Sequence, residues 1–190
     1  MERFAAELRS ATVDGGRLVG HAAVFNRAAR VTDRKGVAHW ERLAPTAFDA
    51  VLSSDPDVRA LINHDPNLLL ARTANGTLKL DVDDDGLIFD ADLPDTSYAR
   101  DLRELVAGGL LTGASFAFVP GRVERSPAPD GLELRTHVEV DRVLDVSAVT
   151  YPAYAGAGVE LRAVTFPAHP LRRYRTRLIL ARAAQKGIRP

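Results

Sequence analysis

A serine and a histidine in this sequence have the side-chain types that nucleophilic catalysis at a carbonyl group requires. Ser115 lies in segment 112–118 (TGASFAF), where small residues precede the hydroxyl group and aromatic residues follow it. Gly113 and Ala114 leave space beside this hydroxyl for the backbone of a substrate. Without a base within hydrogen-bond reach, however, a serine hydroxyl is a weak nucleophile at neutral pH. By itself the segment is better explained as a strand whose serine lies between packed phenylalanines.

His64 is the histidine placed to act as that base. It follows the short apolar segment 58–62 and lies in a polar turn with Asn63 and Asp65. A half-exposed histidine at a strand end can titrate near neutral pH and reach a neighbouring group. Position alone favours a plainer interpretation, a turn histidine that caps backbone groups. Only as a pair do the histidine and the serine predict a nucleophile and its base.

A base of this kind needs an acidic group to orient it, and three acids follow the candidate nucleophile. In a regular strand Glu139, Asp141 and Asp145 would point to one face. The alternative is that all three simply face solvent. An oxyanion hole needs backbone N–H groups or an arginine near the nucleophile. The backbone of Ser147 and Ala148, at the end of the same segment, is a candidate for it.

The sequence contains no pattern typical of a metal, phosphate or cofactor site. Its five histidines form no HExxH motif and no close pair, and there is no cysteine. No GxxxxGK[ST] or GxGxxG motif is present either. The acidic run 83–85 lies in a turn and is best explained as a solvated loop. An esterase of the α/β-hydrolase type would need GxSxG at a strand–helix junction, which is also missing.

Length and composition are those of a globular domain followed by a basic tail. Hydrophobic residues make up 46% and charged residues 26% of the 190 residues, and the formal net charge is zero, so charge argues neither for nor against nucleic acid. There is no signal-peptide pattern at the N-terminus and no apolar stretch of membrane-spanning length. Segment 163–190 has seven basic residues and no acidic ones. We expect a domain at 1–166 and a tail at 167–190 that is helical or removed by processing.

Hydrophobic alternation predicts about eight short strands with two or three helices. This is a mainly β (α+β), mostly antiparallel domain with flanking helices rather than a series of βαβ units. Segments 26–40 and 120–131 are predicted to be irregular. The strands are expected at 17–25, 58–62, 68–73, 78–82, 86–93, 110–119, 132–140 and 143–150, and the helices at about 46–52, 95–107 and 172–185.

The order of four sequence blocks resembles the tailed-phage (Caudovirus) prohead serine protease family. Each block is short, but together they span about residues 17 to 162 with sensible gaps. Asp145 stands where the fourth block of the family usually has glutamate. The blocks are GHAAVF at 20–25 with LAPTAF at 43–48, LINHDP at 61–66, GLIF at 86–89 leading to LTGASFAF at 111–118, and LDVSAVTYPA at 144–153.

The resemblance implies a fold and a set of site residues. The fold would be an antiparallel β-barrel with surrounding helices, as in the herpesvirus assemblin proteases. His64 would be the base and Ser115 the nucleophile. By likeness to the assemblins, Glu139 fits the spacing of the third member best, with Asp145 and Asp141 as alternates. No cofactor and no metal is implied.

The resemblance also implies a role in the maturation of a phage prohead. The chain would be a serine endopeptidase that cleaves the scaffold or the delta segment of the major capsid protein, and itself. It would act inside the immature capsid in the host cytoplasm and self-associate, with a dimer as one form. It would need neither nucleic acid nor a membrane. The alternative is a non-enzymatic capsid-assembly or scaffolding module in which the serine and histidine are idle.

Overall fold

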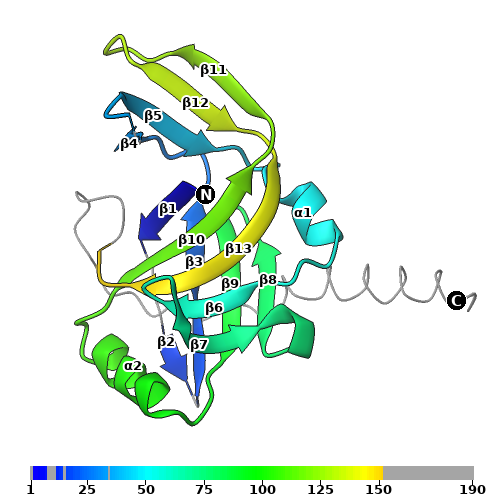
Figure 1. The fold of residues 1–190 in the computed structure, drawn as a ribbon, viewed down its shortest axis with the longest axis vertical. Helices are drawn as coiled ribbons and strands as arrows, with labels where there is room; N and C mark the ends of the chain where they lie inside the picture. Colours follow the sequence, from blue (N-terminus) through cyan, green and yellow to red (C-terminus); the bar gives the residue numbers. More distant parts are fainter. Residues whose placement is uncertain (1, 8–11, 15, 34, 152–190) are drawn as a thin grey trace, which may run out of the picture.

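The structure, a computed structural model, describes residues 2–7, 12–14, 16–33 and 35–151. Strands are the dominant secondary structure in this part of the chain. They form three sheets (Figure 1). The first contains, in spatial order, β1 (Glu2–Glu7), β10 (Gly113–Pro120), β13 (Val140–Val149), β6 (Arg59–Ile62) and β7 (Asp65–Arg72). The second contains β11 (Val123–Pro127), β12 (Glu133–His137), β5 (Ala38–Leu43) and β4 (Ala29–Thr32). The third contains β2 (Thr12–Asp14), β3 (Arg17–Val24), β9 (Gly86–Asp92) and β8 (Leu78–Val82).

The mainly β class and the mostly antiparallel pairing are confirmed, and the closed barrel is not. Most neighbouring strands are antiparallel, but β13 pairs with β6 and β12 pairs with β5 in parallel. Each sheet ends in an edge strand within the described residues, so the three sheets stay open. The parallel pair β13–β6 is the feature that matters for the site, because it brings the end of β6 beside the end of β13.

The centre of the five-stranded sheet is held in place by aromatic packing on one face. Phe116 and Phe118 of β10 are fully buried, and their ring centroids lie 4.9 Å apart. Phe48 packs edge-on against Phe116, with centroids 5.5 Å apart. Because successive side chains of a strand alternate between faces, Ser115 points away from this core. The sequence TGASFAF therefore fixes one face of β10 in the core and leaves the other for the site.

Both helices begin near the predicted positions. In α2 (Ser97–Ala107) the Thr96 side chain caps the first turn by accepting a hydrogen bond from the backbone N–H of Ala99. The short helix α1 (Asp49–Ser53) has no side-chain cap, and the Thr46 hydroxyl instead donates to the backbone carbonyl of Val138.

The two segments predicted to be irregular contain strands instead. Segment 26–40 includes β4 and the start of β5, and segment 120–131 includes β11. Most side chains of β11 are exposed, and half of those of β4 are. Polar edge strands show no hydrophobic alternation, so the pattern search could not detect them. The helix expected at 172–185 and the tail at 167–190 lie outside the described residues.

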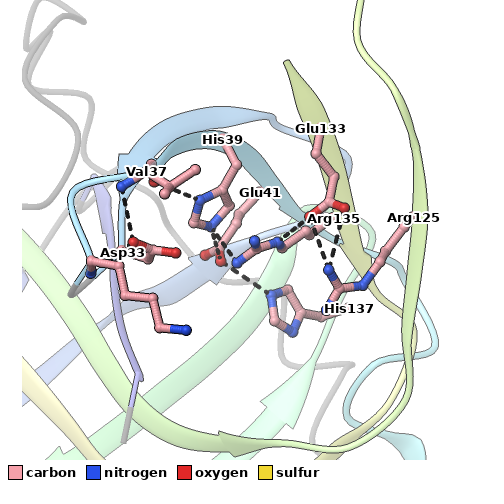
Figure 2. A network of polar contacts seen from close by, with 9 residues as sticks. Asp33, Val37, His39, Glu41, Arg125, Glu133, Arg135 and His137 are labelled. Carbon is pink, nitrogen blue, oxygen red and sulfur yellow. Dashed lines mark hydrogen bonds and ion pairs between the residues drawn. The ribbon is translucent and has the colours of Figure 1, made fainter.

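A buried group of ionisable side chains joins β5 to β12 in the second sheet (Figure 2). Nε2 of His39 lies 2.7 Å from Oε1 of Glu41, and Nε2 of His137 lies 3.9 Å from the same oxygen. All three residues are less than 9% exposed. Burial alone would raise the pKa of Glu41, but the imidazoles of His137 and His39 hold its pKa below the ordinary value of 4.5.

Glu41→Gln is therefore expected to destabilise the fold near neutral pH. A carboxyl group whose pKa is lowered on folding stabilises the native state above its ordinary pKa, and this contribution is lost as the pH falls through the lowered value. We expect the variant to melt roughly 3–10 °C below the native chain at pH 7. The gap should narrow as the pH falls through the lowered pKa of Glu41, because the carboxyl group of the native chain is then itself protonated.

Thermal melting of both chains from pH 3 to 8 measures this effect. Glu124→Gln is the matched control, since Glu124 is an exposed glutamate of β11 in the same sheet. Its melting temperature should stay within about 1–2 °C of the native value at every pH. A gap for Glu41→Gln that is independent of pH would contradict the ionic role of Glu41.

Candidate active site

Ser115 lies in the middle of β10, opposite Ser147 of β13. Since directly paired residues of an antiparallel ladder project to the same face, the two hydroxyl groups share the face opposite the phenylalanine core. Ser115 is 2% exposed and Ser147 is 1% exposed. The nucleophile predicted from the sequence therefore lies on an interior strand of the sheet, and neighbouring residues cover it almost completely.

His64 reaches that face through a tight two-residue turn between β6 and β7. Asn63 and His64 both have left-handed backbone angles, with φ of 51° and 57°, which non-glycine residues seldom adopt. The Asn63 N–H donates to the carbonyl of Ala148 at 2.8 Å, and the Thr150 N–H donates to Oδ1 of Asn63 at 2.9 Å. The turn is thus fastened to the end of β13. The turn expected at His64 is present, but it is shorter than expected, because β7 already begins at Asp65.

The imidazole of His64 joins the serine to an acid. Its Nε2 lies 2.9 Å from Oγ of Ser115, and its Nδ1 lies 2.6 Å from Oδ1 of Asp145. An ionised carboxylate can only accept, so the proton of a neutral imidazole sits on Nδ1. Nε2 then accepts from the serine hydroxyl, which is the arrangement a general base needs.

The acid beside His64 is Asp145, an alternate in the sequence prediction, and not Glu139, the first choice. Glu139 precedes β13, where its backbone carbonyl accepts from the N–H of Gly121. At about 3.3 Å per residue it lies on the order of 20 Å along the chain from Asp145. Asp141 is exposed, and its carboxylate lies beside Gly121. Neither Glu139 nor Asp141 can orient His64 from there.

The backbone of Ser147 and Ala148 is unsuited to the expected oxyanion hole. At both positions β13 has a hydrogen-bonded neighbour on each side, β10 and β6. Their N–H groups lie within these ladders and cannot point at a substrate oxygen. The side chain of Ser147 has a different place, since its hydroxyl lies 2.7 Å from Oδ1 of Asp145. Sequence reasoning missed this hydroxyl, although the VSAVT block contains it.

The site is more enclosed than the sequence indicated. The side chains of His64 and Asp145 are 9% and 11% exposed, whereas a half-exposed histidine was expected. Shielding from water strengthens the interaction between the imidazole and the carboxylate.

Among the described residues no cluster of histidine and acidic side chains could hold a metal ion, and no helix there is long and apolar enough to span a membrane.

A comparison with protein-family models agrees with the resemblance seen in the sequence. The family model described as Caudovirus prohead serine protease matches residues 4–171. No curated protein matches the chain, and no solved structure matches it. The family match covers most of the sequence and includes His64, Ser115 and Asp145. The chain belongs to the caudovirus prohead serine protease family, which implies a serine peptidase with a role in the maturation of the phage capsid.

Proposed function

We propose that this chain is a serine endopeptidase in which Ser115 is the nucleophile, His64 the base and Asp145 the orienting acid. The observation that carries the proposal is the unbroken line of hydrogen bonds from Oγ of Ser115 through His64 to Oδ1 of Asp145. The three residues come from β10, from the turn after β6 and from β13. Adjacent strands of one sheet thus fix their relative positions before a substrate arrives.

Each step of peptide hydrolysis follows from this geometry. His64 takes the Ser115 proton through Nε2 as Oγ bonds to the scissile carbonyl carbon, and it then gives that proton to the leaving amine. The carbon–nitrogen bond breaks and an ester joins Ser115 to the acyl half of the substrate. His64 next deprotonates a water molecule whose oxygen bonds to the ester carbon. The bond between that carbon and Oγ then breaks, and His64 returns the proton to Oγ as the acid product leaves. Throughout, Asp145 keeps Nδ1 of His64 protonated and stabilises the imidazolium cation.

The proposed substrates are proteins of the immature capsid. Family membership supports a place inside the prohead in the host cytoplasm. We therefore propose that the scaffold and the delta segment of the major capsid protein are cleaved there, together with the protease itself. Self-association, as a dimer or a larger assembly, belongs to the same proposal. So does the division into a protease domain at 1–166 and a basic tail at 167–190 that docks onto acidic segments of these partners or is removed.

Labelling with a fluorophosphonate probe tests the proposal without knowledge of the substrate. Such probes react with serines whose hydroxyl is activated by a base. We expect one adduct per chain on Ser115, located by mass spectrometry of the peptides. His64→Ala should slow the labelling at least about 1,000-fold. Full-length chain should be tested both alone and assembled with capsid protein and scaffold. Absence of an adduct on Ser115 in both states would favour the non-enzymatic assembly module.

A further inference from the structure

The hydroxyl group of Ser147 contacts two parts of the site at once. It lies 2.7 Å from Oδ1 of Asp145 and 3.3 Å from the backbone nitrogen of His64. Ser147 is 1% exposed, so solvent does not compete for these contacts. The hydroxyl therefore sits between the carboxylate that orients the imidazole and the backbone that carries the imidazole.

The direction of both hydrogen bonds is fixed by the chemistry of the partners. The backbone N–H of His64 can only donate, so the Ser147 oxygen accepts there. The ionised carboxylate of Asp145 can only accept, so the single Ser147 proton goes to Oδ1. The same oxygen Oδ1 also faces Nδ1 of His64 at 2.6 Å. Two donors thus hold one carboxylate oxygen in place, and a rotation of the Asp145 side chain would break both bonds.

We propose that Ser147 is a positioning residue of the peptidase site, which locks Asp145 and the His64 turn in their reactive arrangement. This inference rests on the proposed roles of His64, Ser115 and Asp145. Asn63 and His64 form the two-residue turn between β6 and β7, where positive φ at both positions is usual, and because neither residue is glycine, contacts from neighbouring strands help to hold the turn. The bond from the His64 N–H to Ser147 is one such contact, at the residue that carries the base. In this scheme Ser147 takes no part in the making or breaking of bonds, and it acts through Asp145 and the backbone of His64.

Removal of the hydroxyl should slow the chemical step and leave probe binding unchanged. In Ser147→Ala one donor to Oδ1 of Asp145 is lost, and the buried N–H of His64 loses its acceptor. We expect the maximal rate of fluorophosphonate labelling of Ser115 to fall about 10- to 100-fold, as for one lost hydrogen bond to a charged group. The probe concentration at half-maximal rate should change less than about twofold. Ser147→Thr, which keeps a hydroxyl group, should recover most of the rate.

A double-mutant cycle with Asp145→Asn separates positioning from a purely structural effect. If Ser147 acts through the carboxylate, Ser147→Ala should slow labelling less than about threefold once Asp145 is asparagine. Val146→Ala is the control for stability. Val146 is 1% exposed, lies on the other face of β13 and packs in the hydrophobic core. Val146→Ala should melt several degrees below the native chain. At a temperature where both chains are folded, its Ser115 should still be labelled at the native rate.

The outcomes distinguish this inference from the proposed function. If Ser115→Ala abolishes labelling while Ser147→Ala labels within twofold of the native rate, the role of Ser147 is wrong and the peptidase assignment stands. The positioning role would also be overturned if Ser147→Ala slowed the labelling of Ser115 by the same factor in the Asp145→Asn variant as in the native chain. If the native chain is labelled at sites other than Ser115, the proposed function itself fails, and the role of Ser147 fails with it.

Discussion

Ser115→Ala is expected to abolish proteolysis by this chain while the fold is retained. With the major capsid protein and scaffold produced in the same cells, the native protease should yield shortened capsid and scaffold chains and the variant only full-length ones. Loss of a triad nucleophile lowers kcat by about 10⁶-fold, because the acyl-enzyme can no longer form. Gel electrophoresis and intact-mass measurement of purified particles give the result directly.

Alanine at position 115 should cost little stability. Its neighbours in the strand are the small residue Ala114 and the buried Phe116, and only a hydroxyl group is removed. Ser126→Ala is the matched control, since Ser126 is an exposed serine of the edge strand β11. The Ser126→Ala variant should cleave the major capsid protein and the scaffold as the native chain does. Normal processing by Ser115→Ala, in a preparation free of host protease, would contradict the proposed mechanism.

The sequence allowed His64 and Ser115 to be singled out as candidate site residues because their signals are local. The apolar run before Asn63 and the cluster of turn-forming residues after it predict a strand that ends at the histidine. The alternation of Ser115 with Phe116 and Phe118 predicts which face of the strand is buried. Neither signal shows that the two residues meet. That came from the order of the family blocks, and the structure places the two side chains in hydrogen-bond contact.

The acid beside His64 could not be predicted in this way, because its position depends on non-local pairing. Counting residues onward from Ser115 assumes that the chain returns directly beside β10. Instead, β11 and β12 form a hairpin in another sheet, which takes up the residues in between. Register shifts at Ala117/Phe118 and Val119/Pro120 further alter the alignment of β10 with β13. Spacing therefore pointed to Glu139, while pairing puts Asp145 beside the histidine.

The hydroxyl of Ser147 went unnoticed for a related reason. A serine in a β-branched, alternating strand is ordinary, and nothing in its neighbourhood distinguishes it from a surface residue. The proposed role of the Ser147 hydroxyl depends on its two hydrogen-bond partners. These are Asp145, two residues earlier, and the backbone of His64, which is far away in the sequence. The first contact is visible in principle, since residues i and i+2 of a strand share a face. The second needs the parallel pairing of β13 with β6.

Asp145→Asn is expected to lower the rate of cleavage about 10³- to 10⁴-fold, whereas Glu139→Gln should leave it within about twofold of the native rate. An asparagine fills the same space but offers an amide where His64 needs a carboxylate. The amide lets the imidazole adopt the wrong tautomer and no longer stabilises the imidazolium cation; the same exchange in a Ser-His-Asp triad costs about 10⁴-fold in kcat. KM should change little, because Asp145 does not contact the substrate.

The pair of variants discriminates between the two acids in a single assay. Rates of capsid-protein cleavage, with the labelling rate of Ser115 as a second readout, are compared at equal protein concentration. Asp141→Asn serves as a further control, since this exposed acid precedes Asp145 on the same strand. A large loss for Glu139→Gln with little loss for Asp145→Asn would mean that β13 shifts its register in the active enzyme. The opposite pattern is expected, because moving Glu139 to His64 would break the pairing of β13 with both β10 and β6.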